Sequence, residues 1–532
     1  MTEEQPNTQP KADAPSTSGT TDTANAANTE QLPQPSAHAT RHSITLDGAE
    51  WQYEATVGTL NIDTEKVKPA ASVFYTAFQA LTADGKSDPT RPVTFVFNGG
   101  PGSSTTFLLL GSLAPHRIAV NDTSADHAPY SLTDNAYTLL PKSDLVFIDA
   151  PGAGFSRIAE KAKAELWSVD GDVRGFSAFI RTFLTAYHRW NSPKYVLGES
   201  YGTTRGAALS YRLQEDGVSL NGLTLISNIL DYSFTLDTSD QYYIGYFPTF
   251  ASVAKYHGKA APDTEITEHL QQARAFANGP LRLALAQGST LDPQTKAAIA
   301  KRYAELTGLG KQYVLDSDLR VLDARFRKQL LRDKGTIVGR YDGRAAGYDL
   351  DPISDDETFV VDDALLGPAY ASLVNAYLRD ELEWSDTRER QEFAHFDWES
   401  TEPGKGWTWW HKLPEHAKTS WGQNIPFPKV TDDLAAAICQ QPWFKVLIGN
   451  GIYDLCTPFN QTEYDIDHMG LPEALRGNIA FTYYPAGHML YSSQESLKKF
   501  RHDLGRFYDA DVADLTQLNE RPQAAKLSGI IG

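Results

Sequence analysis

Short runs of consecutive apolar residues recur along the chain and end in loop-forming residues. Runs without polar alternation are typical of parallel strands that are buried on both faces of a sheet. Helical patterns separate them, for example over 168–190, where Ser168 can cap the helix and apolar residues share one face. The runs are 93–98, 144–150, 194–200, 223–228 and 444–450. This alternation predicts an α/β fold with a mostly parallel central sheet.

The chain before the first buried run has a different pattern. Residues 43–60 predict two strands joined at an Asp47-Gly48 turn, and 72–81 predicts a third strand. Residues 1–40 are rich in Thr, Ala, Gln, Pro and Asn, and the first aromatic residue is Trp51. Such a segment buries too little apolar surface to offset its ordering entropy. We therefore expect an antiparallel hairpin preceded by a disordered tail over 1–40.

The strand–helix rhythm stops over 231–430, which is rich in Tyr, Trp, Asp and Arg and has amphipathic helical patterns. It resumes with the run at 444–450. We therefore expect a core made of 41–230 and 431–510, with 231–430 inserted as a largely helical cap. The last residues, 511–532, are predicted to be weakly ordered.

Composition narrows the function classes. The 532 residues include 48 Lys and Arg against 67 Asp and Glu, which gives a net charge of −19. This charge disfavours nucleic acid as a partner, because the long-range field repels phosphates. Cysteine and histidine spacings typical of zinc sites are absent from the sequence, so no metal and no cofactor is expected. No run of 18 apolar residues occurs, so no membrane-spanning segment is expected, and oligomeric state stays open.

The two cysteines, Cys439 and Cys456, exclude a disulfide-rich secreted scaffold. One bridge between them is possible, but two free thiols in a reducing compartment are expected. The N-terminal residues are acidic and lack the apolar segment of a signal peptide. These observations predict a cytoplasmic protein, with a periplasmic or secreted one as the alternative if the start is mis-assigned.

A candidate nucleophile lies in Gly198-Glu199-Ser200-Tyr201-Gly202, which fits the pattern G-x-S-x-G. It follows an apolar strand and opens a helical stretch, so the tight turn would lift the Ser200 hydroxyl out of the sheet. The alternative is a serine that merely caps a helix. Serine is a weak nucleophile without a histidine base that an acid orients.

His488 is the candidate base, because it lies in a loop after a predicted strand at 478–484. Asp454 is the candidate acid, since it follows the strand at 444–450, and Asp231 is the second choice. A glycine-rich loop, Asn98 to Ser104, follows the strand at 93–98 and lacks the residues of a phosphate-binding loop. Its exposed backbone N–H groups, with that of Tyr201, can form an oxyanion hole.

At this point the chain resembles the serine carboxypeptidases of the α/β-hydrolase superfamily, as a bacterial-type member with few cysteines. NGGPGSS (98–104) is similar to their N-G-G-P-G-C-S-S, and GESYG (198–202) to their G-E-S-Y-A-G. DLVFIDAPGAGFS (144–156) is similar to their strand ending in I-D-x-P-x-G-x-G-F-S. Asp454 and AGHM (486–489) occupy the places of their catalytic acid and base.

The resemblance implies an α/β-hydrolase fold with a helical cap and an exopeptidase that removes a C-terminal residue from peptides. It implies Ser200 as nucleophile, His488 as base and Asp454 as the residue that orients it. The N–H groups of Gly100 and Tyr201 would form the oxyanion hole.

The resemblance also implies that Asn98, the Gly99 N–H and Glu199 bind the terminal carboxylate of the substrate. A carboxylate binds another carboxyl group well only when one of them is protonated. Glu199 is therefore expected to have a raised pKa.

Three departures from the family pattern bear on this expectation. Ser103 replaces a cysteine, so a family disulfide is lost. Ser112 occupies the position of a second family glutamate, which shares a proton with the first, and this weakens the case for carboxylate binding and an acidic pH preference. Arg205 is interpreted either as a charge for that carboxylate or, in preference, as a surface residue. An esterase or acyltransferase acting on a small acyl substrate is the second hypothesis, and a catalytically silent binding protein is the third.

Overall fold

The computed structural model describes residues 32–124, 127–420 and 422–522. The tail that the sequence predicts therefore lies outside the described residues over 1–31, as does the end of the chain over 523–532. Among the helices of the described part, none combines the length and apolar composition that a bilayer crossing requires.

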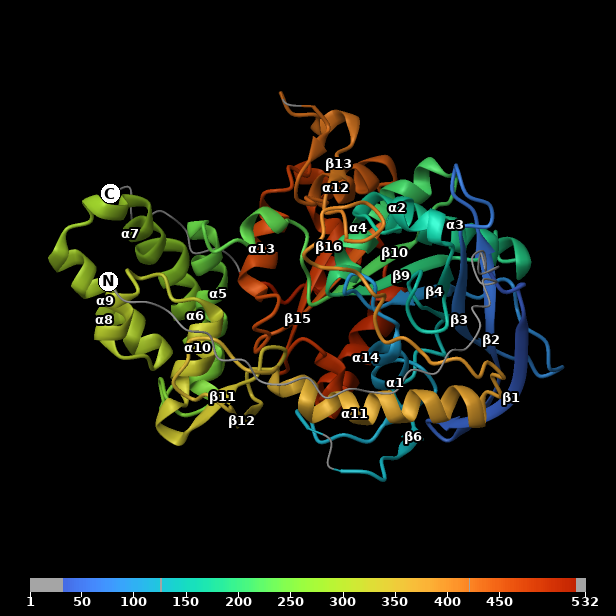
Figure 1. Cartoon of the computed structure of the whole chain (residues 1–532), viewed down its shortest axis with the longest axis horizontal. Coiled ribbons are helices and arrows are strands. Elements are labelled where there is room, and N and C mark those ends of the chain that lie inside the picture. Colours follow the sequence, from blue (N-terminus) through green and yellow to red (C-terminus); the bar gives the residue numbers. More distant parts are fainter. Residues whose placement is uncertain (1–31, 125–126, 421, 523–532) are drawn as a thin grey trace, which may run out of the picture. The chain divides into compact units, whose positions relative to one another are not determined.

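The central sheet has ten strands, nine of them in the order β1-β2-β3-β7-β4-β9-β10-β15-β16, with β8 paired to β3 (Figure 1). From β7 to β16 every neighbouring pair is parallel. Its long strands are β1 (Ala37–Leu46), β2 (Ala49–Ile62), β3 (Ala71–Ala80), β4 (Val93–Phe97), β7 (Asp144–Ile148), β9 (Lys194–Glu199), β10 (Gly222–Ile226), β15 (Lys445–Gly451) and β16 (Ile479–Tyr484). An antiparallel entry followed by parallel strands is the predicted α/β-hydrolase fold, which is confirmed.

At both ends of the described chain, the part that packs on the sheet is longer than the sequence predicts. β1 begins at Ala37, which pairs with Gly58 of β2, so the last residues of the predicted tail form an edge strand. Its outer face is polar, which hides the strand from a search for apolar runs. Near the C-terminus, Leu515 and Leu518 are buried and the Glu520 N–H donates to Phe481 O of β16 at 2.8 Å. Residues 511–522 are thus held by the core.

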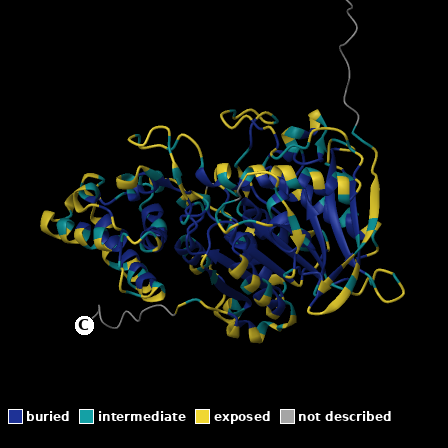
Figure 2. Ribbon diagram, turned by 90° about the horizontal axis from the view of Figure 1, so that it is seen from below, coloured by how far each residue is buried: buried dark blue, intermediate teal, exposed yellow. Residues whose placement is uncertain are grey.

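Helices cover both faces of the sheet, which is buried between them (Figure 2). One face packs against α3, α4 and α12, and the other against α1, α11 and α14. The helices are α1 (Thr106–Gly111), α2 (Lys163–Leu166), α3 (Val169–Ala186), α4 (Tyr201–Glu215), α11 (Val361–Ala376), α12 (Thr431–Gln440), α13 (Phe459–Asp467) and α14 (Gln494–Asp509). Ser168 caps α3 as predicted, accepting a hydrogen bond from the Gly171 N–H.

The inserted segment 231–430 has two unlike parts. The first is helical and has its own apolar cluster, which packs on Leu455 and Phe459 of the core. It contains α5 (Asp240–Tyr256), α6 (Ile266–Phe276), α7 (Arg282–Gln287), α8 (Pro293–Thr307), α9 (Lys311–Asp316), α10 (Asp323–Leu330) and the hairpin β11 (Thr336–Val338) and β12 (Ala346–Tyr348). This part is a helical cap.

The second part of the insertion differs from the expected cap. Helix α11 packs on the core sheet, and 384–430 is mostly irregular, with the short pair β13 (His411–Lys412) and β14 (Asn424–Ile425). Single bridges such as Ser103 to Phe393 and Gly154 to Gln391 attach it to core loops. Backbone pairing of this kind leaves no helical period in the sequence.

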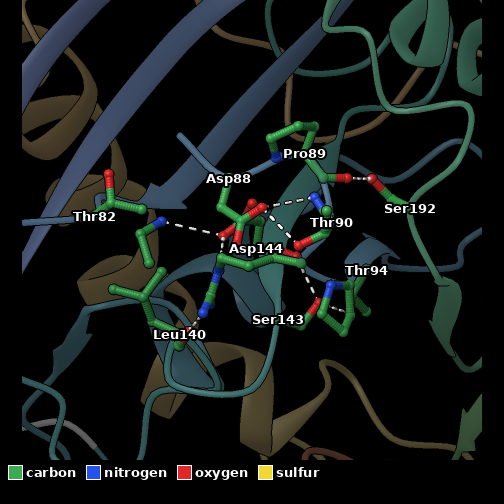
Figure 3. A network of polar contacts seen from close by, with 12 residues as sticks. Thr82, Asp88, Pro89, Thr90, Thr94, Leu140, Ser143, Asp144 and Ser192 are labelled. Carbon is green, nitrogen blue, oxygen red and sulfur yellow. Dashed lines mark hydrogen bonds and ion pairs between the residues drawn. The ribbon is translucent and has the colours of Figure 1, made fainter. Parts of the chain in front are cut away.

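The amino ends of β4 and β7 are fixed by a buried polar network around Asp144 (Figure 3). Its carboxylate accepts from Arg91 Nε at 3.0 Å and from Arg189 Nη1 at 2.7 Å. Next to it, the hydroxyls of Ser143 and Thr94 lie 2.7 Å apart. Removing one partner from such a buried pair is costly, because a charge is left uncompensated. The network thus stabilises the sheet at the amino ends of these parallel strands.

Candidate active site

The candidate catalytic residues follow three strands of the parallel part of the sheet at their carboxyl ends, with β10 between the first and the second. Ser200 follows β9, Asp454 follows β15 and His488 lies in the loop after β16. The carboxyl ends of parallel strands meet at one edge of a sheet, where α/β proteins bind their ligands. The topology therefore brings together side chains that are far apart in the sequence.

Ser200 has the backbone geometry of a strained turn, with φ 60° and ψ −129°. Residues other than glycine rarely adopt this conformation, which costs about 1–3 kcal/mol. The turn is tight because a Cβ at Gly198 would lie 2.1 Å from Gly202 O. The glycine loop also packs against it, since a Cβ at Gly99 would lie 2.5 Å from the Tyr201 N. The loop and the first N–H of α4 therefore adjoin each other beside Ser200.

His488 and Asp454 form a buried hydrogen-bonded pair. The Nδ1 of His488 lies 2.8 Å from Asp454 Oδ2, and both side chains are at most 5% exposed. The other carboxylate oxygen accepts from the backbone N–H groups of Cys456 and Thr457, at 2.8 and 2.9 Å. Burial opposes protonation of His488, but the Asp454 carboxylate outweighs it and raises the pKa of the imidazole. The pairing leaves Nε2 as the nitrogen able to exchange a proton with a nucleophile.

The insertion holds the His488 loop, which the sequence does not predict. The backbone N–H of His488 donates to Tyr341 O at 2.6 Å, and the Gly487 N–H donates to Asp342 Oδ2 at 3.1 Å. From the core side, Ser227 Oγ donates to His488 O at 2.5 Å. The candidate base is thus fixed from both sides of its backbone. Main-chain contacts of this kind have no signature in a single sequence.

Glu199 is buried directly before the nucleophile. Its Oε2 accepts from the Asn98 amide at 3.2 Å and from the Tyr491 phenol at 2.6 Å. Burial raises the pKa of this carboxyl to about 7, although both hydrogen bonds and His488 act in the opposite direction. Asn98 is fixed in turn, because its Oδ1 accepts from the Leu108 N–H at 3.0 Å. Tyr491 is not identified from the sequence as a partner of Glu199, although it lies three residues after the candidate base.

Ser112 and Arg205 have structural roles. The Ser112 hydroxyl donates to Leu108 O at 2.5 Å, within its own helix, and does not bond to Glu199. Both interpretations of Arg205 are wrong: it is fully buried and pairs with Asp172, with Nε 2.6 Å from Oδ2. Its Nη1 donates to Asn98 O at 2.7 Å, so it supports the glycine loop from below. The sequence does contain a sign that Arg205 is buried, because its neighbours on α4 are small and apolar residues.

Asp231 and the two cysteines are the remaining residues that the sequence analysis considers. Asp231, the second choice for the acid, accepts from the Ser233 N–H at 2.9 Å and caps a short turn. Cys439 and Cys456 are both free thiols, and burial raises the pKa of Cys456 to about 12.

A pocket of about 320 Å³ opens beside Ser200. Core and insertion both contribute to its wall, which consists of Gly100, Ser200, Ile229, Tyr232, Thr235, Tyr242, Tyr246, Asp323, Arg340, Trp409, Cys456 and Thr457. The candidate nucleophile and one candidate oxyanion-hole residue therefore face a space large enough for a side chain of a substrate.

The family model and the curated relatives that match this chain are all described as serine carboxypeptidases. Residues 51–254 match the family model described as serine carboxypeptidase. "Serine carboxypeptidase-like 33" of Arabidopsis thaliana is 29% identical over 147 residues, which are 27% of this chain and 28% of that protein. "Vacuolar serine-type carboxypeptidase ATG42" of Saccharomyces cerevisiae is 31% identical over 153 residues, which are 27% of each chain. The chain thus matches these relatives over less than a third of their length.

Among solved structures, the prohormone-processing carboxypeptidase KEX1(DELTA)P of Saccharomyces cerevisiae is 16% identical, with a TM-score of 0.49. The match covers 86% of this chain and 91% of that one. A proline iminopeptidase of Mycobacterium smegmatis is 13% identical, covers 85% of this chain and 97% of its own, and has a TM-score of 0.35.

The prediction of a cytoplasmic location is wrong. A curated relative is by name a vacuolar enzyme, which contradicts a location inferred from cysteine count. The physical error lies in treating scarce disulfides as evidence of a reducing compartment, because buried ion pairs such as Arg205–Asp172 and Arg189–Asp144 also hold a core together. The predicted resemblance itself is confirmed, since residues 51–254 match the serine carboxypeptidase family model.

Proposed function

We propose that this protein is a serine-type carboxypeptidase that hydrolyses the C-terminal peptide bond of peptides. The observation that carries the proposal is Glu199, a buried carboxyl group next to Ser200 with a pKa raised to about 7 by burial. A protonated carboxyl there can share its proton with the terminal carboxylate of a peptide. Asn98 and the Gly99 N–H would complete this receptor. An esterase has no need of such a group.

In the proposed reaction, His488 Nε2 takes the proton of Ser200 Oγ as the oxygen attacks the scissile carbonyl carbon. The N–H groups of Gly100 and Tyr201 would stabilise the resulting oxyanion. The first N–H groups of a helix have no intrahelical acceptor, so that of Tyr201 is available for this role. Asp454 holds the imidazole in the required tautomer.

The C–N bond then breaks, and the leaving amino group takes the proton from His488. The free amino acid departs and leaves an acyl-enzyme on Ser200. Water, deprotonated by His488, attacks the acyl carbon, which releases the shortened peptide and restores the serine.

Substrates that differ only at the C-terminus test the proposal. N-blocked dipeptides, the matching C-terminal amides and short p-nitrophenyl esters are incubated with the protein from pH 4 to 8. We expect release of the C-terminal amino acid from the free acids and much slower cleavage of the amides. Ser200→Ala should abolish turnover of every substrate, and activity retained in this variant would refute the nucleophile.

An esterase or acyltransferase is the second candidate, because Ser112 leaves Glu199 without the second glutamate of the family pattern. Cleavage of esters without cleavage of dipeptides would favour it. No turnover and no labelling of Ser200 by a fluorophosphonate would instead favour a silent binding protein.

A further inference from the structure

The pocket beside Ser200 is lined by none of the residues of the proposed carboxylate receptor. Its wall includes Ser200 and Gly100 but not Asn98, Glu199 or Tyr491. An exopeptidase places the leaving residue against the receptor for the terminal carboxylate. The pocket therefore receives the residue on the other side of the scissile bond, the one that becomes the acyl group.

Arg340 contributes a positive charge to this pocket. It follows β11 in the insertion and is exposed to the pocket that it lines. Within the described part of the chain, no carboxylate lies at ion-pair distance from its guanidinium, whose contact is with the ring of Tyr341 at 5.9 Å. A guanidinium stays charged at every physiological pH and presents five N–H donors. The pocket thus offers a cation with no carboxylate at ion-pair distance, although Asp323 and Asp363 lie near enough to act on it through space.

No other ionisable group of the wall forms an ion pair with Arg340. Asp323 is already engaged, since it accepts from the Tyr242 phenol at 2.5 Å and lies 3.5 Å from Arg327 Nη2. Cys456 is a neutral thiol, because burial raises its pKa to about 12. The aromatic rings of Tyr232 and Trp409 also line the pocket. They suit the aliphatic stem of a side chain whose charged end reaches Arg340.

We infer that Arg340 is a specificity-determining residue, which selects substrates with an acidic side chain on the acyl residue, the one preceding the scissile bond. This inference rests on the proposed carboxypeptidase function for the identity of that bond. Glutamate and glutamine have the same shape, so a preference between them isolates the charge. A charge-assisted hydrogen bond is expected to give about a tenfold higher kcat/KM for glutamate.

The experiment compares N-blocked Glu-Phe and Gln-Phe dipeptides in the wild-type protein and in variants. We expect the preference for the Glu substrate to disappear in Arg340→Gln and to persist in part in Arg340→Lys. Arg302→Gln is the matched control, because Arg302 lies on α8, does not line the pocket and bonds to Gln272 and Glu305. Asp323→Asn should increase the preference about threefold, since one nearby negative charge is removed.

The terminal carboxylate of the substrate is the other possible partner of Arg340, and p-nitrophenyl esters of N-blocked Glu and Gln distinguish the two. These esters lack that carboxylate, so a side-chain site keeps the Glu preference on them. If Arg340→Gln slows both dipeptides equally and leaves both esters unchanged, the inference is overturned. If the dipeptides resist cleavage while the ester preference and its loss persist, the proposed function fails and the inference stands. Equal rates on the two esters in the wild-type protein would also overturn it.

Discussion

The phenol of Tyr491 donates a 2.6 Å hydrogen bond to the carboxyl of Glu199, from a residue 292 positions further along the chain. In the family pattern, a second glutamate shares a proton with the first. A phenol whose own pKa is raised well above its usual value by burial remains a donor, and it stabilises the ionised form of Glu199. The proposed receptor therefore has one titrating carboxyl where the family pattern has two.

Peptide hydrolysis should decline as pH rises through about 7, since burial raises the pKa of Glu199 to that value. Below it, Glu199 is protonated and can share its proton with a substrate carboxylate; above it, two negative charges face each other. Ester hydrolysis should lack this decline, because esters have no terminal carboxylate. Profiles of kcat/KM against pH for one dipeptide and one ester check this. Identical profiles would remove Glu199 from substrate binding.

Tyr491→Phe should move the decline of peptide hydrolysis to higher pH. The hydrogen bond lowers the pKa of Glu199, so its removal makes ionisation harder, by about one pH unit for a charge-assisted bond. Ester hydrolysis serves as the internal control. A decline that stays in place, or moves to lower pH, contradicts the role given to the phenol.

Ser200→Gly should be more stable to unfolding than Ser200→Ala, by about 1 kcal/mol. The reason is the backbone conformation of this residue, with φ 60° and ψ −129°, which glycine adopts more readily than alanine. Both variants lack the hydroxyl, so lost catalysis cannot confuse the comparison. Urea unfolding curves measure the difference. Equal midpoints would mean that the turn stores no strain.

Asp342→Ala should reduce kcat about tenfold on dipeptides and esters alike, with little change in KM, because small displacements of a catalytic group are costly. Asp342 accepts from the Gly487 N–H, next to His488, and also binds Arg344. The matched control is Asp122→Ala, which removes the exposed partner of Arg344 and leaves Gly487 untouched. If the two variants behave alike, Asp342 does not position the base.

His411→Gln should destabilise the protein at pH 6 by about 2 kcal/mol, and the difference should fade as pH approaches 10. Burial opposes protonation of His411, but Asp170 and Asp433, at 2.7 and 2.9 Å, raise its pKa to about 10. A raised pKa stabilises the folded state fully below the unfolded value near 6.5, and this gain is lost as pH rises toward the folded value. Thermal unfolding at both pH values measures it. A constant difference would show that the imidazole is neutral.

The sequence predicted the parallel strands closely, because a short uninterrupted apolar run between loop residues is compatible with few structures other than a buried strand. The run at 93–98 corresponds to β4, which is Val93–Phe97, and the run at 144–150 to β7, which is Asp144–Ile148. The pairing of His488 with Asp454 was likewise predictable, since both follow strands that proved adjacent in the sheet.

Contacts between irregular segments that are far apart in the chain could not be predicted from the sequence. The support of His488 by Tyr341 O uses a backbone carbonyl, which every residue possesses, so no residue type marks it. Arg205 was misjudged for a different reason. A lone arginine on a helix is usually solvated, and only the three-dimensional position of Asp172 reveals a buried pair.

The loop of the insertion around Tyr341 and Asp342 also carries Arg340, so one short stretch of chain both touches the backbone of His488 and lines the pocket beside Ser200. Selectivity and turnover then cannot vary independently. A substitution or exchange that reshapes this stretch to admit a new substrate would also displace His488, the proposed general base. Engineering of the pocket is better directed at α5 or at Trp409, whose positions line the same space without holding the histidine.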